Sequence, residues 1–196
     1  MHEPAYNPSV VPDITRSAPL TARHQQAPRP RRDPYDGLRP WSAITHGVGA
    51  ILAAAGTLLL LWRSARWGLD LWHMVSFAIY GGSMVCLYTA STLYHCVNTS
   101  VSGRLWLRKL DHCSIALLIA GSYTPVCLTA LRDQGAWGWA VFGVIWAMAA
   151  CSCALSLVWI NSPRWLTSAV YLVMGWLAVV ALIPLARTLP AAGMAW

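Results

Sequence analysis

Five long apolar stretches occupy most of this 196-residue chain. They cover residues 43–62, 71–94, 110–131, 136–160 and 166–186. A helix of about 20 apolar residues crosses the hydrocarbon core of a membrane, and each stretch is long enough to do so. Only 11% of the residues are charged, against about 25% in soluble domains. The sequence therefore predicts an all-α, polytopic transmembrane helical bundle with five spans, and it excludes a water-soluble domain.

Residues 1–40 differ from the rest of the chain and are predicted to form a disordered tail. They contain eight of the 12 prolines and six arginines, and they show no periodic apolar face. These arginines either contact anionic lipid or only set the orientation of the first span. Residues 41–196 are the predicted membrane domain. With so many apolar stretches, the net charge of +7 indicates membrane lipid, not nucleic acid, as the partner, and it leaves the oligomeric state open.

Basic residues favour an orientation with the N-terminus in the cytoplasm. In that orientation ten basic residues lie inside and four lie outside. The four outside are Arg63, Arg66, Arg132 and Arg187. Cytoplasmic segments carry an excess of Lys and Arg close to the spans, and tryptophans mark the borders of the stretches as an aromatic belt. Thirteen of the 14 basic residues are Arg, a skew typical of GC-rich bacterial genes, so we expect a bacterial inner membrane protein.

Four ionisable residues lie near the ends of the first three spans. With the N-terminus inside, all of them fall near the cytoplasmic boundary. They are His46, His95, Asp111 and His112. Ser91 precedes His95 by four residues, so both side chains share one helix face. Polar groups are costly inside a membrane, and their convergence at one depth therefore predicts a functional site.

Two histidines and a carboxylate at one depth can hold zinc, which binds imidazole and carboxylate and needs three protein ligands in a catalytic site. Zinc lowers the pKa of its bound water to about 7 and thereby supplies hydroxide. Ser91 and His95 also have the spacing of a nucleophile and a base, although no third member or oxyanion hole accompanies them. The structural alternatives are that Asp111 caps a helix and that the histidines lie at the lipid interface with their polar tips wet.

The third stretch is interrupted by Gly121-Ser122-Tyr123-Thr124-Pro125. Proline removes a backbone hydrogen bond, so Pro125 predicts a kink. This kink either serves packing or opens a cavity beneath the site.

Four motifs resemble those of the hemolysin III family. They are, in chain order, Thr45-His46-Gly47-Val48-Gly49-Ala50, Ser91-Thr92-Leu93-Tyr94-His95, Asp111-His112-Cys113-Ser114-Ile115 followed by residues 118–125, and Gly175-Trp176-Leu177-Ala178. Their order and spacing extend the resemblance over about residues 40–190. The larger group includes the progestin and adipoQ receptors, and alkaline ceramidases look like more distant relatives.

The resemblance implies a seven-helix membrane fold with a zinc site near the cytoplasmic face. It implies that His95 is a zinc ligand, and that Asp111 and Ser91 are catalytic residues beside the metal, Asp111 orienting the zinc-bound water. His46 and His112 match motif positions but are not expected to be ligands. The remaining ligands are expected in a C-terminal His-x-x-x-His, and no histidine follows His112. With five of seven spans, this chain is expected to be a C-terminally truncated member.

The implied function is zinc-dependent hydrolysis of a lipid amide or ester, inactive in this chain if the last two helices are missing. Zinc is the cofactor expected of the intact family fold. The alternative is a non-enzymatic protein, either pore-forming, as the family name suggests, or involved in membrane-lipid homeostasis. A receptor coupled to a partner is a third, weaker alternative.

Overall fold

The computed structural model describes residues 38–159 and 163–188 of the chain. All of them belong to one compact unit of the chain. The tail predicted for residues 1–40 lies outside the described residues except for its last three. Its disorder therefore stays a prediction.

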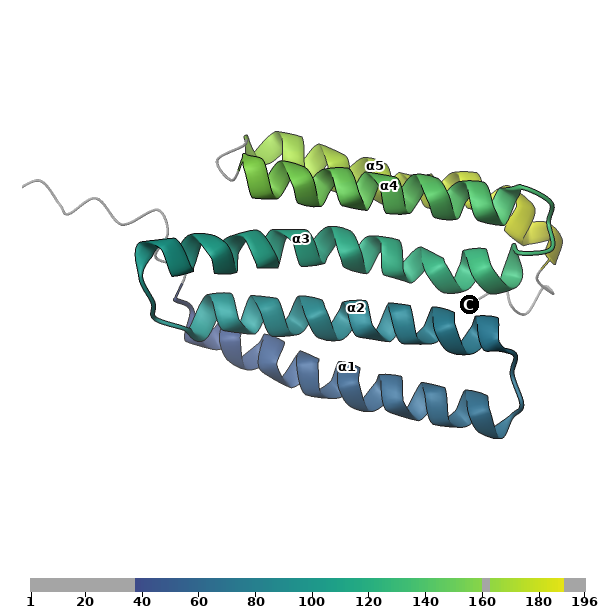
Figure 1. The fold of residues 1–196 in the computed structure, drawn as a ribbon, viewed down its shortest axis with the longest axis horizontal. Helices are drawn as coiled ribbons and strands as arrows, with labels where there is room; N and C mark the ends of the chain where they lie inside the picture. The colour runs from purple at the N-terminus through teal and green to yellow at the C-terminus, as the bar shows by residue number, and fades with distance from the viewer. Residues whose placement is uncertain (1–37, 160–162, 189–196) are drawn as a thin grey trace, which may run out of the picture. The chain divides into compact units, whose positions relative to one another are not determined.

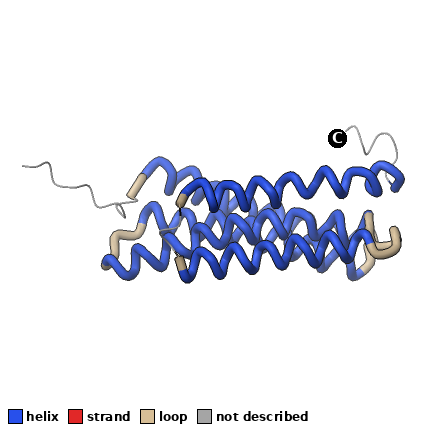
Figure 2. Tube along the Cα trace, turned by 90° about the horizontal axis from the view of Figure 1, so that it is seen from above, coloured by secondary structure: helices blue, strands red, loops and turns tan. Residues whose placement is uncertain are grey.

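The described part of the chain is built from helices joined by short connections. In chain order they are α1 Pro40–Arg66, α2 Leu71–Cys96, α3 Val101–Pro125, a π-helix Val126–Ala130, α4 Trp137–Val158 and α5 Arg164–Thr188. Helices α1 to α4 lie side by side in chain order, and α5 packs against α4 and α3 (Figure 1). All of them run along a common direction (Figure 2).

Five helical segments of the described residues are long and apolar enough to cross a membrane. Their outward side chains are large and apolar, as at Ile51, Leu58 and Ile183, which are 71%, 68% and 66% exposed. Such a surface suits lipid tails, which are as apolar as these side chains, and it does not suit water. These observations confirm the predicted all-α transmembrane bundle.

Helix α3 begins earlier than the sequence predicts. The hydropathy pattern places this span at residues 110–131 with a connection before it, whereas the helix starts at Val101. Ser100 caps this start, because its hydroxyl accepts the Gly103 N–H over 3.2 Å. Hydropathy marks the apolar part of a helix and not its ends, so the basic first turns around Arg104 are missed.

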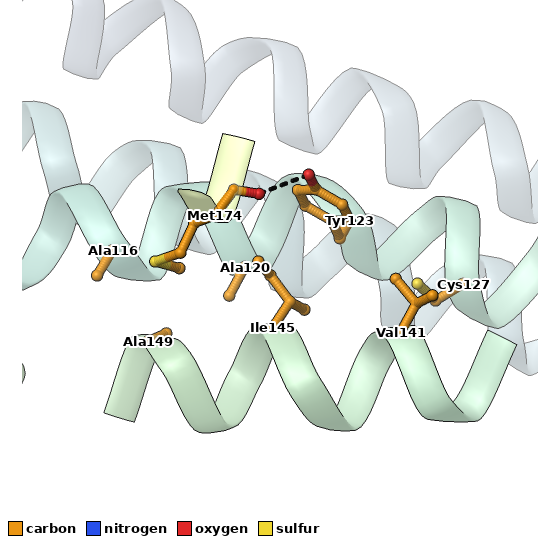
Figure 3. Close-up of a cluster of buried hydrophobic side chains, with 8 residues drawn as sticks. All are labelled: Ala116, Ala120, Tyr123, Cys127, Val141, Ile145, Ala149 and Met174. Atoms are coloured by element: carbon orange, nitrogen blue, oxygen red, sulfur yellow. Dashed lines mark hydrogen bonds between the residues drawn. The ribbon is translucent and has the colours of Figure 1, made fainter. Parts of the chain in front are cut away.

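A core of small and branched side chains lies between α3, α4 and α5 (Figure 3). Ala116 and Ala120 on α3 are fully buried, as are Ile145 and Ala149 on α4. Small residues let membrane helices approach closely, and the resulting dispersion contacts replace the hydrophobic driving force that lipid removes. This core holds the second half of the bundle together.

Tyr123 connects α3 to α5 within this core (Figure 3). Its buried hydroxyl donates to the backbone carbonyl of Met174 over 2.7 Å and lies 3.0 Å from that of Gly175. A buried hydroxyl needs such a partner, since leaving it unpaired in an apolar interior is costly. The motif around Tyr123 therefore has a packing role.

Pro125 marks a change of helix type. Helix α3 ends at this residue, and the chain continues as the π-helix Val126–Ala130. Nearby hydroxyls bond to backbone carbonyls one turn earlier, Thr124 to Ala120 over 3.0 Å and Thr129 to Pro125 over 2.6 Å. Such bonds and local π-turns are the usual way in which a membrane helix tolerates proline. The structure thus has a π-helical segment where the sequence predicts a kink.

Candidate functional site

One end of the α1–α2 pair brings together His46, Ser91 and His95, which we call the histidine cluster. The Ser91 hydroxyl and His46 Nδ1 form a 2.7 Å hydrogen bond, which the hydroxyl donates when Nδ1 carries no proton. The rings of His46 and His95 meet edge to face with their centroids 5.9 Å apart. Ser91 is buried and both histidines are half-buried. Three polar side chains thus meet at a helix end of the membrane bundle.

The antiparallel packing of α1 and α2 produces this cluster. His46 lies in the second turn of α1, and Ser91 and His95 lie in the last two turns of α2. The two residues of α2 are four apart and therefore share a face. The Arg39 N–H, just before α1, donates to the His95 carbonyl over 3.1 Å and fixes the start of α1 against the end of α2.

Tyr88 and Gly49 complete the surroundings of His46. The Tyr88 ring meets the His46 ring edge to face at 6.0 Å, on the side of α2 that also carries Ser91. Gly49 makes room for that ring, because a Cβ at this position would lie 2.8 Å from Tyr88 Cδ1. The second glycine of the His46-Gly47-Val48-Gly49 motif thus has a packing explanation.

Arg104 closes the end of α2 beside the cluster. Its side chain is only 6% exposed, and its guanidinium donates to the carbonyls of Tyr94 and Val97 over 2.8 and 3.0 Å. The guanidinium also lies 4.9 Å from the centroid of the Tyr94 ring, whose neighbour is the His95 ring at 5.0 Å. A cation near the carbonyl end of a helix is favourable. Arg104 therefore positions the turn that carries His95.

Asp111 and His112 lie inside α3 and not at its start. Because α3 begins at Val101, Asp111 is ten residues into the helix, about 15 Å along its axis. Its backbone carbonyl accepts the hydroxyl of buried Ser114 over 2.7 Å, and the His112 carbonyl accepts the Tyr171 hydroxyl over 2.8 Å. The first bond lies within α3, and the second ties the middle of α3 to α5.

A metal ligand set is not assembled by the described residues. Within 38–159 and 163–188, no three His, Cys, Asp or Glu side chains gather closely enough to hold a metal ion. His46 and His95 meet, but Asp111 does not join them as a third ligand. The roles predicted for Asp111, Ser91 and His95 stay predictions, and of these three the structure brings Ser91 and His95 into one cluster.

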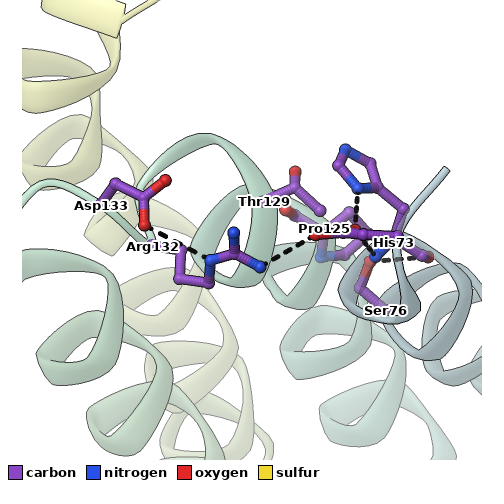
Figure 4. Close-up of polar contacts among 7 residues, drawn as sticks. His73, Ser76, Pro125, Thr129, Arg132 and Asp133 are labelled. Atoms are coloured by element: carbon purple, nitrogen blue, oxygen red, sulfur yellow. Dashed lines mark hydrogen bonds and ion pairs between the residues drawn. The ribbon is translucent and has the colours of Figure 1, made fainter.

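A second polar cluster lies at the opposite end of the bundle (Figure 4). Asp70 caps α2, where its carboxylate accepts the backbone N–H of His73 over 3.1 Å and also contacts the His73 ring. Arg132, beyond the π-helix, donates to the other oxygen of Asp70 over 3.1 Å and lies near Asp133. The hydrogen bonds from His73, with help from Arg132, lower the pKa of Asp70 to about 2. This cluster links two loops on one membrane side.

His46 is a residue that the sequence analysis placed at the depth of the candidate site but to which the resemblance assigned no role. The resemblance placed it outside the zinc ligands, whereas the structure makes it the hydrogen-bond partner of Ser91. The available signal was that His46 lies near the start of a span that runs antiparallel to the span carrying Ser91. A spacing pattern cannot reveal such a contact, because it joins residues 45 positions apart.

Comparison with known proteins agrees with these motifs. Residues 40–196 match the family model described as haemolysin-III related. The hemolysin-3 homolog of Bacillus subtilis (strain 168) is 37% identical over 152 residues, which are 78% of this chain and 70% of that protein. Hemolysin-3 of Bacillus cereus is 37% identical over the same length, covering 78% and 68%. No solved structure matches the chain. The chain therefore belongs to the haemolysin-III related family of membrane proteins.

Proposed function

We propose that this protein acts on membrane lipids at the histidine cluster and that its reaction is hydrolysis of a lipid amide or ester. The reaction adds one water across the C–N or C–O bond and yields a fatty acid with an amine or an alcohol. The observation that carries this proposal is the Ser91–His46 hydrogen bond beside His95, one to two turns from the helix ends. The carbonyls of lipids lie at a similar depth, near the edge of the hydrocarbon core.

The cluster supplies groups that this chemistry needs. An imidazole takes up and returns a proton near neutral pH, so His46 can accept the proton of Ser91 or of a water in its place. The Ser91 hydroxyl is held at 2.7 Å and is buried, so its direction is fixed. Arg104 and Tyr94 hold the adjoining turn and with it the His95 ring.

Zinc is the cofactor that the family resemblance implies, and the described residues do not complete a site for it. A catalytic zinc takes three protein ligands, and no such group is present within residues 38–159 and 163–188. No step is therefore assigned to the metal. We propose zinc binding with His95 as one ligand and Asp111 as a catalytic partner, and metal analysis of the purified chain tests this. One zinc is expected in the intact family fold, and in this chain any bound zinc should be lowered by His95→Ala and retained by His73→Ala at the other end of α2.

The activity is tested with the full chain in lipid nanodiscs that contain a ceramide or a fatty-acid ester lipid. We expect fatty acid release that falls by about 10²–10⁴ in Ser91→Ala and in His46→Gln, as for the loss of a general base. Ser76→Ala is the matched control, since Ser76 is equally buried in α2 but lies near its other end. Release that never exceeds the protein-free blank, or an equal loss in the control, contradicts the proposal.

Membrane permeabilisation is the second candidate, and the names of the two relatives, hemolysin-3 homolog and hemolysin-3, favour it. In this case the protein releases dye from vesicles while all lipids remain intact. A role in membrane-lipid homeostasis without catalysis leaves both dye and lipids unchanged.

We further propose that the protein lies in a bacterial inner membrane with its N-terminus, and so the histidine cluster, on the cytoplasmic side. The relatives come from bacteria, and the basic residues favour this orientation. Cys96 is exposed at the cluster end of α2, so an impermeant maleimide should label it only after the cells are opened. Labelling of Cys96 in intact spheroplasts contradicts this orientation.

A further inference from the structure

Two arginines and two tryptophans surround a hollow at the C-terminal end of α1. The hollow has a volume of about 420 Å³ and is lined by Leu59, Trp62, Arg63, Arg66 and Trp67. We call it the Arg–Trp hollow. It lies at the opposite end of α1 from His46, so it is separate from the histidine cluster.

Cation–π contacts orient both guanidinium groups. The Arg63 guanidinium carbon lies 4.7 Å from the centroid of the Trp67 ring, and that of Arg66 lies 5.8 Å from the centroid of the Trp62 ring. Each pair is four residues apart, the spacing that places side chains next to each other on a helix. Such contacts hold an arginine over a ring while its N–H groups stay available at the edge of the guanidinium plane.

Among residues 38–159 and 163–188, no acceptor receives a hydrogen bond from the guanidinium groups of the hollow. The carbonyls at the end of α1 are satisfied by backbone N–H groups: Trp67 donates to Arg63, Gly68 to Ala65 and Leu69 to Ser64. Gly68 allows this ending because its φ is 67°, a conformation that glycine adopts without strain. In the described ranges, all three ion pairs involve Asp70 or Asp133 and none involves Arg63 or Arg66.

The walls of the hollow change from polar at the membrane boundary to apolar towards the hydrocarbon core, as a phospholipid changes from headgroup to acyl chains. Arg63, Arg66 and Trp67 lie at the end of the membrane-spanning helix α1, where tryptophan and arginine meet headgroups. Leu59 lies one turn deeper, towards the hydrocarbon core. A headgroup phosphate at the arginines thus leaves its acyl chains beside Leu59.

We propose that the Arg–Trp hollow binds the phosphate of an anionic phospholipid such as phosphatidylglycerol. A guanidinium offers two parallel N–H donors to a phosphate, and two such groups beside one hollow can share its two non-bridging oxygens, each of which accepts more than one hydrogen bond. A zwitterionic headgroup carries its own cation near the phosphate and gains less from the arginines. The net negative charge of the headgroup therefore sets the preference.

Native mass spectrometry of the full chain, ejected from nanodiscs with equal amounts of phosphatidylglycerol and phosphatidylcholine, measures this preference. We expect the wild type to retain phosphatidylglycerol. Arg63→Gln and Arg66→Gln should each lower its retention about fivefold, the usual effect of one arginine near an anionic surface. Lysine at both positions keeps the charge but loses the paired donors, so retention should fall less than with glutamine.

Arg187→Gln is the matched control, because Arg187 is an exposed arginine in the last turn of α5. It should retain phosphatidylglycerol as the wild type does. Circular dichroism establishes that each variant is folded. The proposal is overturned if the wild type retains both lipids equally, if the glutamine variants match the wild type, or if Arg187→Gln loses as much. Displacement of the lipid by inorganic phosphate alone likewise overturns the lipid assignment in favour of a free anion.

Discussion

Replacing Gly81 with alanine tests the close approach of α1 and α2 that creates the histidine cluster. A Cβ on Gly81 would lie 2.7 Å from Thr57 Cβ and closer still to both γ atoms of that residue. Thr57 has little freedom to move away, because a β-branched side chain in a helix has few rotamers and its hydroxyl donates to the Ala53 carbonyl over 2.6 Å. The extra methyl group therefore has to push the two helices apart.

Gly82 provides the matched control on the same helix. A Cβ on Gly82 meets no atom within 4 Å, so alanine there only adds helix propensity, about 0.5–1 kcal/mol. Gly81→Ala receives the same gain, but it also incurs an overpacking cost of about 1–3 kcal/mol. The two variants should thus differ by about 1–3 kcal/mol, with Gly81→Ala the less stable.

The assay is reversible unfolding of the full chain in mixed micelles, followed by circular dichroism as the denaturing detergent is increased. Thr57→Ala in the Gly81→Ala background removes both γ atoms and should recover most of the lost stability, a coupling that only contacting residues show. Equal stability of Gly81→Ala and Gly82→Ala would refute the close approach, and with it the geometry that places His46 against Ser91.

Two further predictions concern the other end of the bundle and its core. Tyr123→Phe removes the hydrogen bond to the Met174 carbonyl and should lower the free energy of unfolding by about 0.6–1.5 kcal/mol in the same assay. Tyr80→Phe, outside the core cluster, is the control and should leave this free energy unchanged. Asp70 has its pKa lowered to about 2 in the folded protein, from an ordinary value of 3.8. The folded state therefore gains from the ionised carboxylate at higher pH and loses this gain as the pH falls from about 4 to 2. Wild-type stability should fall more steeply over that interval than that of Asp70→Asn, and parallel curves would contradict the Asp70 contacts.

The spans could be predicted from the sequence because charged side chains are costly in the hydrocarbon core, so a span is a long stretch without them. Residues 71–94 are free of Asp, Glu, Lys and Arg, and α2 occupies Leu71–Cys96. The rule fails where a helix continues past the hydrocarbon, as in the first turns of α3, which carry Arg104 and other basic residues. Helix ends depend on caps such as Ser100 and on carbonyl partners such as those of Arg104, and hydropathy does not report either.

Topology predicted that His46 and His95 lie at one depth, whereas which side chains touch was predictable only within a single helix. Ser91 and His95 share a face because of their spacing, and this follows from helix geometry alone. The pairing of His46 with Ser91 depends instead on how far α1 is shifted along α2. Close contacts set that shift, including Gly81 against Thr57 and Gly49 against Tyr88.

The position of Asp111 follows from the same reasoning. A depth estimate from sequence assumes that α3 begins where its apolar residues begin, and it then sets Asp111 level with His95. The helix begins nine residues before 110, but the close contact of Gly121 with Ser83 shows that these added turns extend past the end of α2 and do not move Asp111 inward. Asp111 lies ten residues before Gly121 on α3, and Leu93 lies ten residues after Ser83 on the antiparallel α2, so Asp111 is level with the turn between Ser91 and His95. The depth of Asp111 was therefore predictable from topology, whereas its direction around α3 was not, and within the described residues it does not join His46 and His95 in a set of three metal ligands.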